Sequence, residues 1–284
     1  MTAFIEQLQA VVGVEGLTSD PAELEPRLSE WRGIYQGRTA LLVRPGSTEE
    51  VAAILRVCAA HGVGVVPQGG NTGMCAAAIP DMSGEQIILS VERMNRIRGV
   101  DAANFSMEVE AGCILANAQE AAQAAGRFFP LSLGAEGSCQ VGGNIATNAG
   151  GINVGRYGTA RALVLGLEVV LADGTIVNTL RALRKDTAGY DVKQLFIGSE
   201  GTLGVITAAV LRLFADPGER ATALVGLGRA GAAVELLAAL KTRLGDRIES
   251  FELVSQRVFA LVQSNIAGAS LPFDEPHAWY VLLE

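Results

Sequence analysis

Glycines gather in three short stretches of this chain, where they alternate with small hydroxyl and amide side chains. The first stretch is Pro67-Gln68-Gly69-Gly70-Asn71-Thr72-Gly73, and the others cover residues 134–138 and 142–151. Because glycine has no Cβ, such stretches can expose runs of backbone N–H groups. Concavities lined by N–H groups bind anions, and a diphosphate is the commonest anion that needs two of them. The glycine stretches therefore predict a site for a ligand that contains a diphosphate.

Two further motifs follow in the same order, Lys-Asp-Thr-Ala-Gly-Tyr-Asp at 185–191 and Gly-Ser-Glu-Gly-Thr-Leu-Gly at 198–204. Together with the glycine stretches, they resemble the FAD-binding half of the vanillyl-alcohol oxidase/p-cresol methylhydroxylase superfamily. Within that superfamily the chain looks most similar to the FAD-dependent D-2-hydroxy acid dehydrogenases, which act on D-2-hydroxyglutarate, D-lactate or glycolate. The resemblance runs from about Arg38 to the C-terminus, and several motifs in order make it more specific than one glycine motif.

The resemblance implies which residues bind FAD. The first glycine loop would bind the diphosphate, residues 130–138 would pass the ribityl chain and ring, and residues 142–147 would pack beside the diphosphate and ring. The backbone at 204–206 would meet adenine or the pyrimidine edge of the flavin, although a buried strand after a glycine turn explains that segment nearly as well. The implied FAD-binding residues are Pro67, Gly69, Gly70, Asn71, Thr72, Gly73, Met74, Leu131, Gly134, Ala135, Ser138, Gly142, Gly143, Ala146, Thr147, Gly204, Val205 and Ile206.

The resemblance also bears on how the flavin would be held. Some members of the superfamily carry a histidine in the first glycine loop and bond it covalently to the isoalloxazine ring. Here Asn71 follows the double glycine, and the chain has only two histidines. We therefore expect FAD to be bound non-covalently.

Oxidation of a 2-hydroxy acid needs a base for the hydroxyl proton, a cation for the carboxylate and flavin N5 as the hydride acceptor. His61 ends a predicted helix, where the helix dipole favours a cation, and we interpret it as structural. His277 lies in a polar loop near the C-terminus. Four polar residues match family positions but could equally form structural ion pairs or hydrogen bonds: Arg156, Tyr157, Lys185 and Asp186.

In the family pattern, the catalytic histidines, glutamate, arginine and lysine come from a second half, often around a divalent metal. No residue here fits that pattern, so the catalytic residues stay unknown and no metal site is expected in these 284 residues. The chain would hold the cofactor and lack the substrate-side half. Either it is a fragment, or a partner supplies the rest.

The overall composition excludes several classes of function. A net charge of −8 argues against nucleic acid and against a polybasic membrane surface as partners. With 49% hydrophobic and 18% charged residues, the chain can bury a large core. No apolar run reaches the roughly 18 residues of a membrane span. The N-terminus lacks a basic region and predicts an amphipathic helix, so we expect no secretion signal and a cytoplasmic location. The four cysteines form no C-x-x-C pair, which argues against a disulfide or metal site: Cys58, Cys75, Cys113 and Cys139.

Local signals predict alternating strands and helices. Ser47-Thr48-Glu49-Glu50 forms a capping box for a helix that ends near Gly62. Asp173-Gly174 predicts a hairpin turn, and residues 216–219 look like a linker. Strands are predicted over 41–43, 63–66, 86–91, 105–111, 167–171, 175–178 and 205–214, with a helix over 114–125. After the linker, strands are predicted over 221–227, 247–253 and 279–283, with helices over 230–244 and 254–263.

These signals predict an α+β protein: an N-terminal helical arm (1–37), a two-part FAD-binding domain of the p-cresol methylhydroxylase type (38–216) and the beginning of an incomplete α+β substrate or cap domain (217–284). The expected function is oxidation of a D-2-hydroxy acid, with electrons passed to an electron-transfer flavoprotein, a quinone or a cytochrome. NAD is not expected, because no G-x-G-x-x-G motif is present. Two alternative functions stay open: a flavin-carrying electron-transfer subunit and an NADPH-dependent flavin reductase of the cell-wall precursor type. The chain could also form a homodimer.

Overall fold

The computed structural model describes residues 2–284, which divide into two compact units. Unit 1 comprises the chain up to Pro130, Gly134–Ala149 and Ala160–Asp216, and unit 2 comprises Leu131–Leu133, Gly150–Thr159 and Pro217–Glu284. The sequence analysis assigned residues 131–133 and 150–159 to the domain 38–216, but both segments cluster with unit 2. They are joined to each other by a hydrogen bond from Ile152 N to Ser132 O of 3.0 Å.

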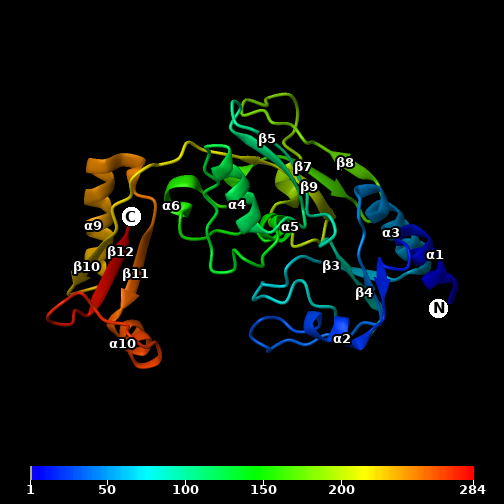
Figure 1. Cartoon of the computed structure of the whole chain (residues 1–284), viewed down its shortest axis with the longest axis horizontal. Coiled ribbons are helices and arrows are strands. Elements are labelled where there is room, and N and C mark those ends of the chain that lie inside the picture. The colour runs from blue at the N-terminus through cyan, green and yellow to red at the C-terminus, as the bar shows by residue number, and fades with distance from the viewer. Residues whose placement is uncertain (1) are drawn as a thin grey trace. The chain divides into compact units, whose positions relative to one another are not determined.

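Unit 1 contains a four-stranded sheet in the order β1-β2-β4-β3. Strands β2 and β3 both run parallel to β4, and β1 pairs antiparallel with β2. Figure 1 shows β3 and β4 side by side. The strands are β1 (Leu17–Thr18), β2 (Leu42–Val43), β3 (Gly64–Gln68) and β4 (Gln86–Ser90). Leu42 and Ile88 of this sheet are fully buried and pack in one apolar cluster with Leu24 of helix α2 (Pro21–Leu24).

Helix α3 (Thr48–His61) connects β2 to β3 and confirms the predicted start and stop signals. The Ser47 hydroxyl accepts a hydrogen bond from Glu50 N at 3.2 Å. The Glu50 carboxylate reaches back to Gly46 N at 2.7 Å, one residue earlier than in a standard capping box. Gly62 ends the helix in the left-handed conformation, with φ of 66°.

A second sheet in unit 1 has five antiparallel strands in the order β5-β6-β9-β7-β8, and Figure 1 shows β7 and β9 as neighbours. Its strands are β5 (Ile97–Asp101), β6 (Ser106–Glu110), β7 (Val164–Val170), β8 (Ile176–Asn178) and β9 (Val205–Arg212). The predicted hairpin turn is present, with Gly174 at φ 79°. The sequence analysis missed β5, because this edge strand is mostly exposed and lacks an apolar alternation.

Two buried carboxylates hold the second sheet together. Glu110 on β6 accepts hydrogen bonds from the Arg96 guanidinium at 2.8 Å and from Arg96 N at 3.0 Å. Burial alone would raise the pKa of Glu110, but the hydrogen bonds and charges of Arg96 and Arg98 lower it below its usual value. Glu168 on β7 accepts from the hydroxyls of Thr48 at 2.6 Å and Thr207 at 3.0 Å. Glu168 thereby ties the start of α3 to the five-stranded sheet.

The N-terminal segment is part of unit 1 and is only partly helical. Helix α1 (Thr2–Val12) packs against α3 through buried Phe4, Leu8 and Val12. The ring of His61 lies 5.3 Å from that of Phe4, and its Nε2 is 3.0 Å from the side-chain oxygen Oε1 of Gln7. These contacts give His61 a structural role. The remaining helices of unit 1 are α2 (Pro21–Leu24), α4 (Leu115–Ala124), α5 (Val141–Ala146), α7 (Ala160–Leu163) and α8 (Lys193–Phe196), with a 3₁₀ turn at Glu25–Arg27.

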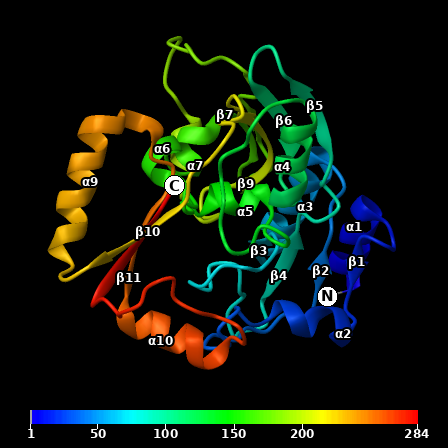
Figure 2. The same cartoon turned by 60° about the vertical axis from the view of Figure 1, so that its left-hand side comes forward.

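Unit 2 contains a three-stranded antiparallel sheet in the order β10-β12-β11 (Figure 2). Its elements are α6 (Val154–Tyr157), β10 (Ala223–Leu227), α9 (Gly231–Leu244), β11 (Phe251–Ser255), α10 (Gln256–Asn265) and β12 (Trp279–Leu283), with a 3₁₀ turn at Gly245–Arg247. Buried Glu249 accepts from Arg156 Nη1 at 2.5 Å and from the Tyr157 hydroxyl at 3.0 Å, which holds α6 to the rest of unit 2. His277 packs against the rings of Phe273 and Tyr280.

Within residues 2–284, no helix is both long and apolar enough to cross a membrane.

Candidate active site: a cofactor pocket in unit 1

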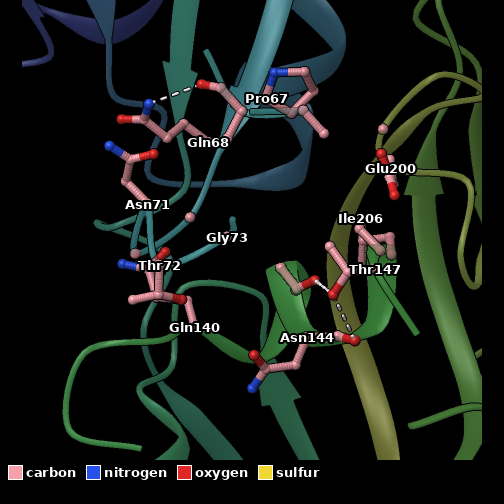
Figure 3. A pocket seen from close by; sticks show the side chains of 18 of the residues that line it. Pro67, Gln68, Asn71, Thr72, Gly73, Gln140, Asn144, Thr147, Glu200 and Ile206 are labelled. Carbon is pink, nitrogen blue, oxygen red and sulfur yellow. Dashed lines mark hydrogen bonds between the residues drawn. The ribbon is translucent and has the colours of Figure 1, made fainter. Parts of the chain in front are cut away.

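A pocket of about 350 Å³ lies within unit 1 and is lined by three segments that are distant in sequence. They are the end of β3 with the loop that follows it (67–78), helix α5 with its flanks (140–147) and the turn that leads into β9 with its first residues (200–206). Val91 completes the lining. Figure 3 shows Asn71 and Thr72 of the first segment on one side and Glu200 and Ile206 of the third on the other. Residues of three predicted motifs, 67–73, 142–151 and 198–204, therefore meet at one cavity, whereas the predicted stretch 134–138 does not line it.

The loop after β3 is fastened to the N-terminal segment. Gln68 is 1% exposed, and its amide nitrogen donates to Arg27 O at 3.0 Å and to Ala78 O at 2.9 Å, which closes the base of the loop. Asn71 adopts a left-handed conformation with φ of 51°, and its side-chain nitrogen donates to Ser29 O at 2.9 Å. Because Asn tolerates this conformation better than most residues, Asn71 suits the turn.

The backbone N–H groups of residues 69–73 donate no hydrogen bond to any residue that the structure describes. Backbone donors in folded proteins are nearly always paired with protein, water or a ligand. Five successive free donors in a concave loop form the kind of nest that binds an anion. This run is the feature of the pocket that fits a diphosphate.

Helix α5 adds another donor from the opposite segment. The N–H groups of Val141 and Gly142 donate to Cys113 O at 2.9 Å and Ala111 O at 2.7 Å, which anchors the helix to the end of β6. The N–H of Gly143 has no partner among the described residues. A Cβ at Gly143 would have no atom within 4 Å, so this glycine borders open space.

Gly70 lines the pocket, as predicted, and also has a packing role that was not predicted. A Cβ there would lie 2.0 Å from the carbonyl oxygen of Ser138. Gly70 is therefore required for the close packing of the loop against residues 138–139.

The turn into β9 is held against α5. Gly198 N donates to Ile145 O at 3.1 Å, and Glu200 N donates to Ala146 O at 2.9 Å. A Cβ at Gly204 would lie 2.7 Å from Val169 Cγ1, so this glycine allows β9 to begin close to β7. These contacts bring the 200–206 segment to the pocket.

The pocket is electrically unusual for an anion site. Among the residues that line it, Glu200 is the only one with a charged side chain, although Arg32 donates to the carbonyl oxygen of the lining residue Met74. The carbonyl oxygen of the Gln140 side chain is buried without a hydrogen-bond donor.

The structure brings most of the predicted residues to the pocket. Those that line it are Pro67, Gly69, Gly70, Asn71, Thr72, Gly73, Met74, Gly142, Gly143, Ala146, Thr147, Gly204, Val205 and Ile206. Gly134, Ala135 and Ser138 belong to unit 1 but do not line the pocket, and Leu131 clusters with unit 2. Ser138 instead supports the pocket from behind, through its contact with Gly70.

Several lining residues were missed by the sequence analysis. They are Gln68, Cys75, Ala76, Ala77, Ala78, Val91, Gln140, Asn144, Glu200 and Gly201. Gln68, Asn144 and Glu200 each adjoin a glycine, and this polar–glycine adjacency was the available signal. Val91 carries no such signal, because it reaches the pocket only through the pairing of β3 with β4.

The next feature is the arrangement of the possible metal ligands and of the cysteines. Within residues 2–284, no group of three His, Cys, Asp or Glu side chains could hold a metal ion. All four cysteines are free, and only Cys75 is exposed. Burial raises the pKa of Cys58 and Cys113 to about 11, which keeps these thiols protonated.

Residues 39–180, half of the chain, match the family model described as FAD binding domain. The chain belongs to this FAD-binding family. A structure of p-cresol methylhydroxylase with bound substrate superposes with a TM-score of 0.81 at 18% identity and covers 99% of this chain and 60% of that one. The predicted α+β fold of the p-cresol methylhydroxylase type is confirmed.

The curated relatives are about twice as long as this chain. A mitochondrial D-2-hydroxyglutarate dehydrogenase from Bos taurus is 44% identical over 266 residues, which are 94% of this chain and 48% of that protein. A D-2-hydroxyglutarate–pyruvate transhydrogenase from Saccharomyces cerevisiae is 36% identical over 93% of this chain and 53% of that protein. The chain therefore spans about half the length of the curated relatives it matches.

The names of the relatives overturn one expectation. The bovine protein and other similar dehydrogenases are named as mitochondrial. The cytoplasmic location inferred from the N-terminus was therefore wrong, since these names point to mitochondria instead.

Proposed function

We propose that this chain binds FAD non-covalently and forms the cofactor-binding part of a D-2-hydroxy acid dehydrogenase. The observation that carries the proposal is the run of free N–H donors at 69–73 together with the free N–H of Gly143, all in residues that line one pocket. A diphosphate would satisfy donors from both segments at once. The FAD-binding family match and the dehydrogenase names of the relatives support the same ligand.

In this proposal the loop 69–74 and Gly143 bind the diphosphate, while 204–206 borders another part of the cofactor. The bound flavin would supply the hydride acceptor for oxidation of the hydroxy acid. The chain's own residues bind and orient the cofactor. Non-covalent binding is supported by Asn71, whose side chain is engaged with Ser29, and by the lack of a histidine among the lining residues.

We further propose that the groups acting on the hydroxy acid come from outside these 284 residues, with 38–216 as the FAD-binding domain and 217–284 as the start of the substrate domain. The lining of the pocket contains no histidine, lysine or arginine, and His61 and His277 are engaged in packing. A positioned base is typically worth 10²–10⁴-fold in rate. FAD-loaded chain should therefore show no rapid anaerobic bleaching with D-2-hydroxyglutarate, D-lactate or glycolate, and rapid bleaching would refute this part.

FAD binding is tested by titrating the purified chain and following quenching of flavin fluorescence. We expect about one FAD per chain, released into the supernatant on acid precipitation. Gly143→Val should weaken FAD binding more than tenfold, because its side chain fills the open space beside the free N–H. Gly99→Val is the matched control, since Gly99 also borders open space but lies on β5 outside the pocket. Failure of the unmodified chain to bind FAD, or flavin retained in the acid pellet, would contradict the proposal.

A second candidate concerns the electron acceptor. The yeast relative is named as a transhydrogenase that couples D-2-hydroxyglutarate to pyruvate. This name favours a 2-oxo acid as one acceptor, besides an electron-transfer flavoprotein, a quinone or a cytochrome. Reduced flavin in a protein that includes the substrate-side half should then be reoxidised anaerobically by pyruvate, and unchanged reduced flavin would exclude this acceptor.

A further inference from the structure

One arginine holds the chain just before the third wall of the pocket, which we define as residues 200–206. Arg161 Nη1 donates to the backbone oxygen of Gln194 at 2.9 Å and to the side-chain oxygen of the same residue at 2.7 Å. Arg161 Nη2 donates to the backbone oxygen of Ile197. Backbone carbonyls at the end of a helix lack helical partners, and a basic side chain can supply them. The Arg161 guanidinium therefore fixes the C-terminal end of α8.

The backbone of Arg161 is bound in turn to the segment that follows helix α5, and α5 with its flanks lines the pocket. Arg161 N donates to Asn148 Oδ1 at 3.0 Å. Asn148 lies just beyond the end of α5 and adopts a left-handed conformation with φ of 50°, which Asn tolerates better than most residues. Arg161 thereby connects the end of α8 to the end of α5.

Gly198 packs against the Arg161 guanidinium. Its φ is 81°, and a Cβ at this position would lie 3.4 Å from Arg161 Nη2. Gly198 N donates to Ile145 O at 3.1 Å. Glu200 N donates to Ala146 O at 2.9 Å, at the point where the third wall begins. Arg161 therefore supports the backbone that attaches the third wall to α5.

The contact with α8 requires the guanidinium group of Arg161. The residue is half-buried, and no carboxylate of the residues that the structure describes lies within ion-pair distance, whereas Arg156 binds Glu249. A half-buried charge costs free energy unless hydrogen bonds replace its water. The planar fork of arginine has donors on both terminal nitrogens and can bind two carbonyl groups at once, whereas the lysine ammonium acts as a point charge. Joint binding of Gln194 O and Ile197 O is the contact that explains an arginine here.

We propose that Arg161 is a positioning residue for the FAD site, which holds the third wall of the pocket in place. Arg161 does not itself line the pocket, so its effect passes through the backbone of residues 197–200. Without its guanidinium, the attachment of the wall to α5 depends on the backbone hydrogen bonds of Gly198 and Glu200. The wall should then open locally and present fewer of its groups to the cofactor. This inference rests on the proposed binding of FAD.

Amide hydrogen exchange of the chain without FAD, followed by NMR, tests the positioning directly. The amides to compare are those of Gly198 and Glu200, here called the wall amides. In Arg161→Gln, we expect the wall amides to exchange about tenfold faster than in the unmodified chain, because their hydrogen bonds to α5 open more often. Amides of β3 and β4, which lie outside this connection, should exchange at unchanged rates. Unchanged exchange of the wall amides in Arg161→Gln would overturn the proposal.

Arg127→Gln is the matched control. Arg127 also donates to two backbone oxygens, those of Ala102 and Gly126 at 2.8 Å each, and it does not line the pocket. The variant therefore removes a guanidinium of the same kind from another part of unit 1. We expect normal exchange of the wall amides and unchanged FAD affinity. Equally fast exchange of the wall amides in Arg127→Gln would show a general loss of stability and would overturn the specific role of Arg161.

FAD titrations followed by fluorescence measure the consequence for the ligand. We expect the affinity of Arg161→Gln for FAD to be about tenfold lower, at a temperature at which circular dichroism shows the variant to be folded. Arg161→Lys keeps the charge and loses the fork, so part of the loss should remain. Full affinity in either variant would overturn the proposal. If Arg161→Gln does not fold, Arg161→Lys supplies both measurements.

The exchange measurement needs no ligand, so a failure of this inference can be told apart from a failure of the proposed function. An unmodified chain that binds no FAD would refute the proposed function. Wall amides that exchange at normal rates in the Arg161 variants would refute the positioning role, whether or not the unmodified chain binds FAD.

Discussion

The two Gly-Gly pairs of the pocket look alike in sequence and differ in what their glycines do. In the pair 142–143, a Cβ at Gly142 would lie 2.6 Å from Ala111 Cβ, whereas a Cβ at Gly143 would meet nothing within 4 Å. In the pair 69–70, a Cβ at Gly70 would lie 2.0 Å from Ser138 O, whereas one at Gly69 would make only ordinary contact with Gln140 at 3.4 Å. Each pair therefore combines one glycine that packs against the chain with one that has room beside it.

The largest expected effect comes from Gly70→Ala, which places a methyl group against the rigid carbonyl of Ser138. We expect a loss of about 3 kcal/mol in the free energy of unfolding, since overpacking against backbone forces the loop to move. Thermal unfolding followed by circular dichroism measures this loss. An unchanged melting temperature would show that the loop after β3 relaxes freely, and the distinction between the two glycines of that pair would disappear.

A smaller effect is expected for Glu110→Gln, which weakens the sheet on which α5 rests. Loss of the ionic hydrogen bonds from Arg96 should cost about 2 kcal/mol at pH 7. The pKa of Glu110 is lower in the folded protein than its usual value of 4.5, so its stabilisation is present above that pH and is lost as the pH falls through the folded value. Urea unfolding at several pH values should show the two proteins converging below about pH 4.5. A difference that persists in acid would contradict the ionic role of Glu110.

Gly142→Ala and Gly143→Ala compare adjacent residues in one helix. Gly142→Ala should lower the free energy of unfolding by about 1–2 kcal/mol, because the new methyl group meets Ala111. Gly143→Ala should raise it by about 0.5–1 kcal/mol, because alanine is the better helix residue and has free space. Equal effects in denaturant titrations would refute the division of roles within this pair.

The smallest effect concerns the rim of the first loop. Cys75 is the only exposed thiol among the four and lines the pocket, whereas burial raises the pKa of Cys58, Cys113 and Cys139. A thiol reagent should therefore label one cysteine per folded chain quickly, and bound FAD should slow that labelling a few-fold. Cys75→Ser should abolish the fast phase. Labelling of two or more thiols at equal rates would contradict this assignment.

Much of the fold could be predicted from the sequence, because its signals are local. The cap at Ser47 and Gly62, the apolar repeat of α3 and the Asp173-Gly174 turn act over a few residues, and each was confirmed. The elements after residue 217 were also present, although β11 and α10 begin later than predicted. Edge strand β5 escaped prediction, because its pairing with β6 supplies the order that its own residues do not signal.

The sequence by itself indicated that glycine-rich motifs would line a cavity, and those that begin at residues 67, 142 and 198 do so, since glycine and small polar residues leave the backbone exposed. Only the tertiary structure decided which glycine of each pair packs and which has open space, because Ser138 meets Gly70 through a fold that brings distant residues together. For the same reason, only the tertiary structure placed residues 131–133 and 150–159 in unit 2 and Glu200 alone across from the nest. The backbone conformation that a residue prefers depends on its neighbours in sequence, whereas the residues that a side chain contacts depend on the fold of the whole chain.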